Sequence, residues 1–165
     1  SNQYVGCIAP NKSGGAILAM HHGIYFLNFE TEEFTFVCDP ESDKPDNRFN
    51  DGKCDAYGRF WAGTMNLEEK DPLGALYRID RDHSVTKMVD KVTVSNGIAW
   101  NPDNSIMYYI DTRTKSVFAF DYDLKAGSIS NRRVVVKIPD GQGSPDGMTS
   151  DSEGIFQDGI RATEN

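Results

Sequence analysis

Three Asn/Asp–Gly pairs carry side chains that can bind a cation. They are Asp51-Gly52, Asn96-Gly97 and Asp146-Gly147, and their glycines lie 45 and 50 residues apart. Carboxylate and amide oxygens are hard ligands that suit Ca²⁺, Mg²⁺ or Mn²⁺, and Zn²⁺ is also possible. The glycine in each pair lets the backbone turn sharply without a Cβ clash. If the pairs occupy one place in successive repeats, their oxygens converge and predict a site for one divalent metal ion.

The chain repeats itself around these pairs. Each pair opens a stretch that reads as a short strand, a polar turn and the start of another strand, in residues 50–63, 95–110 and 145–156. Hairpin patterns with alternating or β-branched residues occupy residues 23–37, 75–88 and 117–136. A period of about 40–50 residues built from short strands is typical of β-propeller blades. We therefore predict an all-β fold, a β-propeller.

The predicted blades fill the chain as one partial propeller domain, residues 1–165. Blades are expected near residues 4–38, 48–91 and 94–138, a fourth starts in 144–156, and 155–165 form an atypical tail. A propeller needs a closed ring to protect the edges of its blades. About three blades plus a stub do not close a ring. We expect either a fragment or a second chain that completes the propeller.

Composition and charge narrow the class of protein. The chain has 165 residues, of which 38% are hydrophobic, and a formal net charge of −8. An acidic surface repels phosphates, so we expect neither a nucleic acid nor a membrane as partner. No apolar run approaches the roughly 20 residues of a membrane helix, and no signal peptide is visible. The three cysteines are odd in number and lack C-x-x-C spacing. We read them as reduced thiols of a cytoplasmic protein; one incidental disulfide is the alternative.

Several ordered motifs resemble one family. They are Asn47–Lys53, Gly58–Met65, Gly74–Tyr77, Ser95–Trp100, Met107–Thr112 and Pro145–Met148. Together they resemble the regucalcin/gluconolactonase family, which includes senescence marker protein and the luciferin-regenerating enzymes. The resemblance covers roughly residues 4–154. It implies a propeller of the six-bladed type, one central divalent metal ion (Ca²⁺, Zn²⁺, Mn²⁺ or Mg²⁺) and hydrolysis of lactones.

The resemblance also implies roles for individual residues. Asn96 and Asp146 would be metal ligands, and Asp146 would also be the catalytic acid/base. Arg48 and Asn50 would bind the substrate. Glu68 falls at a further substrate position, although Glu69 is adjacent and the loop varies in length.

Asp51 has no direct metal contact by this resemblance. We expect it to orient its neighbours from just outside the metal ligands.

Two departures from the family pattern leave the function open. The family's third ligand is a glutamate near the start of its first blade, and nothing in this sequence supplies it. Residues 155–165 look like a truncation or a foreign junction. The first hypothesis is a gluconolactonase-like enzyme, in which the metal polarises the ester carbonyl of a sugar lactone and water attacks. The alternative is a non-catalytic truncated propeller that acts as a metal-binding or interaction module.

Ordinary structural roles compete with each assignment. Asn/Asp–Gly pairs are common turns, and Arg48 could form a salt bridge between blades. Glu68 could be a solvated loop acid. His21 and His22 are adjacent on a predicted strand and would point to opposite faces, so they do not readily chelate together.

Overall fold

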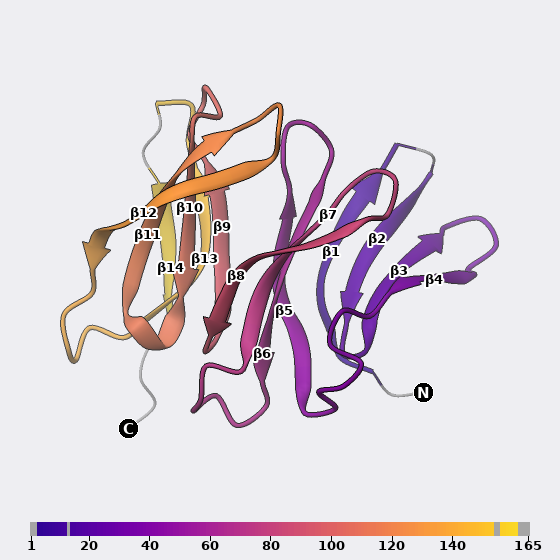
Figure 1. The fold of residues 1–165 in the computed structure, drawn as a ribbon, viewed down its shortest axis with the longest axis horizontal. Coiled ribbons are helices and arrows are strands. Elements are labelled where there is room, and N and C mark those ends of the chain that lie inside the picture. Colours follow the sequence, from indigo (N-terminus) through magenta and orange to yellow (C-terminus); the bar gives the residue numbers. More distant parts are fainter. Residues whose placement is uncertain (1–2, 13, 154–155, 162–165) are drawn as a thin grey trace.

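The computed structural model describes residues 3–12, 14–153 and 156–161 and consists mainly of antiparallel strands (Figure 1). Three sheets have four strands each, hydrogen-bonded in chain order. The first contains β1 (Val5–Asn11), β2 (Gly15–Met20), β3 (Gly23–Asn28) and β4 (Phe34–Cys38). The second contains β5 (Asn47–Cys54), β6 (Phe60–Asn66), β7 (Gly74–Ile79) and β8 (Val85–Val92). The third contains β9 (Ser95–Trp100), β10 (Ile106–Asp111), β11 (Ser116–Asp123) and β12 (Ser128–Lys137), with the 3₁₀ turn η1 (Thr112–Thr114) before β11. The two-stranded fourth sheet pairs β13 (Ser144–Ser150) with β14 (Phe156–Arg161).

The sheets fan out with their first strands along one line. β1, β5, β9 and β13 contact one another in that order, and the later strands of each sheet lie farther out (Figure 1). Every residue of β9 is buried, whereas most of β12 is exposed. β9, between the second and fourth sheets, is therefore covered on both faces, whereas β1, the first strand of the terminal sheet, contains no buried residue. This arrangement confirms the prediction of an all-β propeller with three blades and a stub.

Apolar side chains between neighbouring sheets form the core. One cluster joins the second and third sheets and contains Trp61, Trp100 and Tyr122. The rings of Trp61 and Trp100 meet edge to face with centroids 6.0 Å apart, a favourable aromatic geometry. A second cluster joins the first and second sheets around Phe49 and Phe60. The alternation of apolar residues along the strands thus supplies both faces of the second sheet with a partner.

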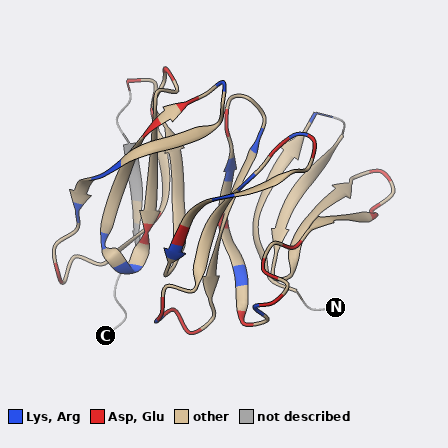
Figure 2. Cartoon of the chain, in the orientation of Figure 1, with Lys and Arg blue, Asp and Glu red and all other residues tan. Residues whose placement is uncertain are grey.

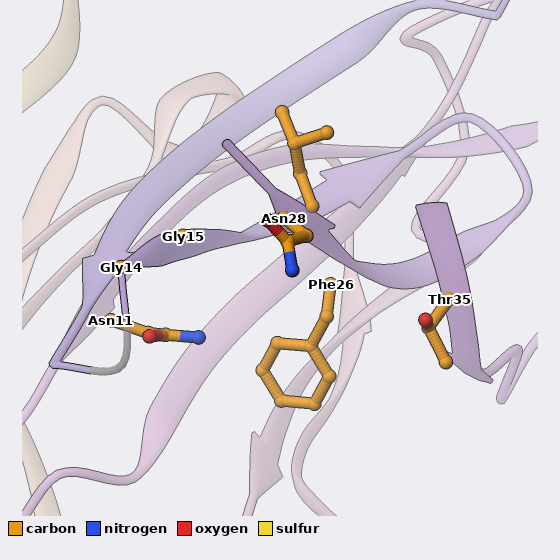
Figure 3. A pocket seen from close by; sticks show the side chains of 7 residues that line it. Asn11, Gly14, Gly15, Phe26, Asn28 and Thr35 are labelled. Carbon is orange, nitrogen blue, oxygen red and sulfur yellow. The ribbon is translucent and has the colours of Figure 1, made fainter. Parts of the chain in front are cut away.

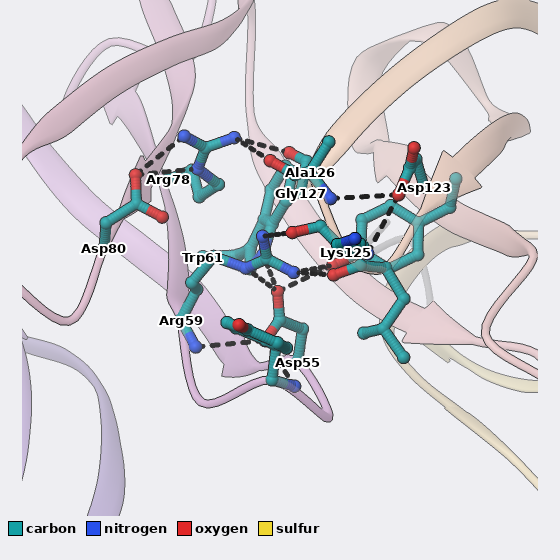
Figure 4. A network of polar contacts seen from close by, with 12 residues as sticks. Asp55, Arg59, Trp61, Arg78, Asp80, Asp123, Lys125, Ala126 and Gly127 are labelled. Carbon is teal, nitrogen blue, oxygen red and sulfur yellow. Dashed lines mark hydrogen bonds and ion pairs between the residues drawn. The ribbon is translucent and has the colours of Figure 1, made fainter.

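A buried ion pair also ties the second sheet to the third (Figure 4). The Asp55 carboxylate accepts hydrogen bonds from Arg59 Nε (2.7 Å), Trp61 Nε1 (3.0 Å) and Tyr122 Oη (2.6 Å). Arg59 in turn donates to the carbonyl oxygen of Leu124. Burial alone raises the pKa of Asp55, but the hydrogen bonds from Tyr122, Trp61 and Arg59 hold it below its usual range. The network lies where β5 ends, so it fixes that end of the inner strands.

Close approach between sheets requires glycine at one point of β6. A Cβ on Gly63 would overlap the side chain of Ser95, the first residue of β9. The Ser95 hydroxyl accepts a hydrogen bond from Tyr109 Oη at 2.7 Å and is held there. Gly63 therefore allows the second and third sheets to approach at the start of β9.

The outer face of the first sheet is apolar and partly exposed, because Leu18 in its middle is buried whereas Ile8 and Phe36 are open to solvent. Ile8, Leu18, Tyr25 and Phe36 are direct cross-strand neighbours, one from each strand. Ile8 is 55% and Phe36 57% exposed. This row lies on the face opposite the one that packs on the second sheet.

Charged residues lie mainly in the loops and turns at the ends of the strands (Figure 2). Cys7, Cys38 and Cys54 are free thiols. Burial raises the pKa of Cys7 to about 12, so this thiol is protonated and unreactive at neutral pH. Among the described residues, no helix is long and apolar enough to cross a bilayer.

Candidate functional site

The candidate residues lie where three inner strands begin. Arg48, Asn50 and Asp51 are on β5, Asn96 is on β9, and Asp146 is on β13. These strands lie side by side in the fan, and their starting ends lie together at its lower end in Figure 1. Residues separated by about 50 positions in the sequence are therefore brought to one end of the fan.

A bulge interrupts each of these strands near its start. In β5 the extra residue is Asn50, between the pairs Phe49–Thr64 and Asp51–Gly63. In β9 the extra residue is Gly97, after Asn96. A bulge changes the direction in which the following side chains point. Asp51 follows its bulge whereas Asn96 precedes its own, so the expectation that they hold equivalent places is wrong in register.

Asn50 links β5 to β9. Its Nδ2 donates to the carbonyl oxygen of Ser95 at 2.8 Å. One amide hydrogen is used in this bond, and the second hydrogen and Oδ1 are the groups with which Asn50 could bind a hydroxyl. Arg48, two residues earlier on β5, is half-buried and donates from Nη1 to the Phe49 carbonyl oxygen at 3.0 Å.

Asn96 is connected to β13 through η1. Its side chain is 2% exposed, and its Nδ2 donates to Thr112 Oγ1 at 3.0 Å. Thr112 Oγ1 donates to the carbonyl oxygen of Pro145 at 2.9 Å. The hydrogen-bonded chain from Asn96 therefore reaches β13 at Pro145, the residue directly before Asp146.

The negative charge of Asp146 acts on the Asp51 carboxylate. Burial raises the pKa of Asp51, and the negative charge of Asp146 raises it further. A hydrogen bond from the Gly52 N–H to Asp51 Oδ1 (2.7 Å) and the charge of Lys53 act in the opposite direction. A cation bound near Asp51 and Asp146 would offset this repulsion.

Glu68 lies apart from this group. It is in the loop between β6 and β7, its side chain is 72% exposed, and it forms an ion pair with Lys70 at 3.6 Å. The adjacent Glu69 is instead bound to η1, because Arg113 donates from Nε to its carbonyl oxygen (2.9 Å) and from Nη2 to its carboxylate (3.2 Å). The loop is thus fixed at Glu69, and Glu68 points into solvent.

An open cavity runs along the inner strands beside the candidate residues. It measures about 480 Å³ and is lined by residues of four strands: Ile8–Pro10 of β1, Asp51–Cys54 of β5, Ile98 of β9, and Gly147 and Met148 of β13. A second hollow of about 320 Å³ lies on the first sheet and contains none of the candidate residues (Figure 3). Its lining includes Asn11, Phe26, Asn28 and Thr35. The cavity along the inner strands is the one that adjoins the predicted site.

The oxygen ligands that Asn96 and Asp146 offer are of the type that a hard divalent cation binds. Asn96 and Asp146 offer an amide and a carboxylate oxygen, which suit Ca²⁺ or Mg²⁺. Ca²⁺ takes about 6–8 oxygen ligands, and within the described ranges no group of three or more His, Cys, Asp or Glu side chains forms a metal site. The described residues could therefore hold one side of a cation.

Sequence reasoning missed Thr112 as part of this site. Thr112 stands at the end of a quoted motif, directly after the buried Asp111, whose carboxylate accepts the backbone N–H groups of Thr93 and Val94. A buried carboxylate beside a hydroxyl residue at the end of a strand is a signal that could have directed attention to η1.

Comparison with known proteins places the chain. Residues 1–157 match the family described as "SMP-30/Gluconolactonase/LRE-like region". Regucalcin from Xenopus laevis is 45% identical over 155 residues, covering 91% of this chain and 52% of that protein. A solved structure of a luciferin-regenerating enzyme has a TM-score of 0.91 at 30% identity and covers 97% of this chain and 56% of that one. A structure from Agrobacterium tumefaciens, described as regucalcin, a calcium-binding protein, has a TM-score of 0.89 at 25% identity and covers 94% and 53%.

The chain spans about half the length of the curated relatives it matches. The match to the family nevertheless extends over nearly all of its own residues, and the similar structures share its fan of sheets. The resemblance inferred from the motifs is confirmed: the chain belongs to the SMP-30/gluconolactonase/LRE-like family.

Proposed function

We propose that this chain carries part of the site of a divalent-cation-dependent hydrolase acting on a sugar lactone, in the manner of a gluconolactonase. The observation that carries the proposal is the hydrogen-bonded connection from Asn96 through Thr112 to the carbonyl oxygen of Pro145, the residue directly before Asp146. The family membership and the calcium-binding description of the related A. tumefaciens regucalcin support it.

The residues of the chain would divide the work as follows. The Asp146 carboxylate would accept a proton from the attacking water and later return it to the leaving oxygen. Arg48 and the second amide hydrogen of Asn50 would donate to sugar hydroxyls and fix the position of the ring. Asp51 would orient its neighbours from just outside the cation ligands. Glu68 stays a proposed substrate contact, on a loop that would need to fold toward the inner strands.

Asn96 and Asp146 would hold the cation, with Ca²⁺, Mg²⁺, Mn²⁺ and Zn²⁺ as the candidates. When bound, such a cation supplies positive charge that polarises the ester carbonyl and stabilises the developing oxyanion. Further ligands, in the family a glutamate of another blade, would come from outside the described residues or from a second chain.

A second chain is also a proposed partner for the first sheet. The row that contains the exposed Ile8 and Phe36 and the partly buried Tyr25 is an apolar face of the kind that another sheet covers. Light scattering of the purified chain over a concentration series would test this. A monomer at every concentration would contradict the proposed assembly.

A non-catalytic metal-binding or interaction module is the second candidate. The exposed apolar side chains of Ile8 and Phe36 on the first sheet favour the interaction role. Cation binding by calorimetry without any lactone turnover would select this candidate over the hydrolase.

The direct test is hydrolysis of gluconolactone, followed by acid release with a pH indicator and corrected for spontaneous hydrolysis. We expect turnover only with added divalent cation, and Asp146→Ala should lower it by about 10²–10⁴-fold, the usual contribution of general acid–base catalysis. Asp140→Ala is the matched control, because Asp140 is an exposed acid whose partner is Lys115. Cation-independent turnover, or full activity of Asp146→Ala, would refute the proposal.

A further inference from the structure

We propose that Thr112 fixes the orientation of the Asn96 amide and so directs Asn96 Oδ1, and not Nδ2, toward the cation. This makes Thr112 a positioning residue. The claim that Thr112 contributes to cation binding rests on the function proposed above. The claim that Thr112 orients the Asn96 amide does not.

The chemistry of the hydrogen-bonded chain sets its direction. The carbonyl oxygen of Pro145 can only accept, so the Thr112 hydroxyl must donate its one proton there, over 2.9 Å. The lone pairs of Oγ1 are then what Thr112 presents to Asn96, at 3.0 Å. An amide oxygen facing them would be repelled, whereas an amide N–H is bound. Asn96 must therefore place Nδ2 on Thr112 and turn Oδ1 to the other side.

Thr112 is itself held firmly, so it can act as a reference point. It is 7% exposed, its N–H donates to the Val94 carbonyl oxygen (3.1 Å), and its own carbonyl oxygen accepts the N–H of Lys115 (3.0 Å). The Asp111 carboxylate binds the backbone N–H of Val94 at 3.0 Å from the other side. The start of β9 and η1 are thus joined by several bonds around Asn96.

The Thr112 hydroxyl is the only group on the hydrogen-bonded chain that a small substitution can remove without changing shape. Valine has nearly the volume of threonine but neither accepts nor donates a hydrogen bond. In Thr112→Val the Asn96 amide loses its partner and can rotate, and β13 loses its bond at Pro145. Outer partners of metal ligands typically change metal affinity by about 10–100-fold when removed.

The test uses two measurements on the whole chain. In ¹⁵N-labelled protein, the Asn96 side-chain amide protons, assigned with Asn96→Ala, should exchange slowly in the original chain and in Thr112→Ser, and rapidly in Thr112→Val. Mn²⁺ binding, measured by water-proton relaxation, should weaken by about 10–100-fold in Thr112→Val and be retained in Thr112→Ser. Thr114→Val is the matched control, because Thr114 Oγ1 binds the Asp111 carbonyl oxygen (2.7 Å) on the same turn. It should change neither measurement.

The outcomes separate the two levels of the proposal. Slow exchange of the Asn96 amide in Thr112→Val would overturn the orienting role, whatever the cation does. Rapid exchange with unchanged Mn²⁺ affinity would overturn the link between orientation and cation binding. If the original chain binds no Mn²⁺, the proposed function fails, and the exchange measurement still decides whether Thr112 orients Asn96.

Discussion

The buried carboxylate of Asp55 makes the sharpest stability prediction. Its Oδ2 accepts from Arg59 Nε, Trp61 Nε1 and Tyr122 Oη, and its Oδ1 accepts the backbone N–H groups of Tyr57 (2.9 Å) and Arg59 (3.0 Å). Asp55→Asn keeps the shape but replaces one oxygen with an N–H₂ group, which cannot accept. In either orientation at least two donors lose their acceptor, and Arg59 loses its counter-charge.

The expected cost follows from these losses. A buried donor left without an acceptor costs about 1–3 kcal/mol, and removing one partner of a buried ion pair costs about 3–5 kcal/mol. The terms overlap, so we expect the free energy of unfolding to fall by about 3–5 kcal/mol. A domain is stable by only about 5–15 kcal/mol, so this single change would remove a large part of its stability.

Urea unfolding followed by tryptophan fluorescence and far-UV circular dichroism measures this cost. Trp61 and Trp100 lie in the adjoining core and report directly on it. Asp121→Asn is the control, because the side chains of Asp121 and its ion-pair partner Arg133 are 48% and 42% exposed, and exposed ion pairs contribute little to stability. The expected loss is about 3–5 kcal/mol, so a free energy of unfolding for Asp55→Asn that lies within about 1 kcal/mol of the original value would refute the reasoning.

The stabilisation by the ionised Asp55 carboxylate should depend on pH. Because the folded-state pKa of Asp55 is lowered, its contribution is complete above the unfolded value of about 3.9 and is lost as the pH falls through the folded value. The stability difference between the original chain and Asp55→Asn should therefore shrink on acidification. A difference that grows below pH 4, about the unfolded pKa, would contradict the assigned direction.

Two other substitutions test features of the site and of the ion-pair network. Asp51→Asn should stabilise the cation-free chain at neutral pH, because a carboxylate with a raised folded-state pKa destabilises the fold once it is ionised. Urea unfolding should show a higher free energy of unfolding for this variant at pH 7 but not at pH 3, which lies below the unfolded pKa of about 3.9. Gly127→Ala should destabilise the fold for two reasons: the left-handed backbone (φ 66°) costs a non-glycine residue about 1–2 kcal/mol, and the new Cβ would overlap the Arg59 guanidinium. Gly141 is also left-handed (φ 83°) but has nothing near its Cβ, so Gly141→Ala should show the backbone cost alone. Equal losses in the two glycine variants would contradict the guanidinium contact.

The fold was accessible to sequence reasoning because each blade is a local unit. Strands such as β9 and β10 are joined by short polar turns, so their periodicity and their Asn/Asp–Gly starts are visible in a few consecutive residues. The apolar residues on both faces of the second sheet, including Trp61 and Phe49, are likewise visible as strand patterns. Repetition at one period then predicts a common axis.

The site was only partly accessible, because its geometry depends on contacts between blades. The bulge at Asn50 comes one residue before Asp51, whereas the bulge at Gly97 comes one residue after Asn96, and this difference of two places cannot be seen in matching Asn/Asp–Gly pairs. The bond from Asn96 to Thr112 spans 16 residues, and the bond from Thr112 to Pro145 spans 33. The ion pair between Arg113 and Glu69 likewise crosses from one blade to the next and leaves Glu68 exposed. Such bonds between distant segments have no local sequence signature.

The missing side chain at Gly63 has a consequence for the whole fan. Because β6 of one blade meets the first residue of β9 there, a methyl group at this point would act as a wedge and change the rotation from blade to blade. In an array that must come round to meet itself, such an angular error would accumulate with each blade. One hydrogen atom in place of a methyl group therefore helps to set the curvature with which this family of sheets can wrap around an axis.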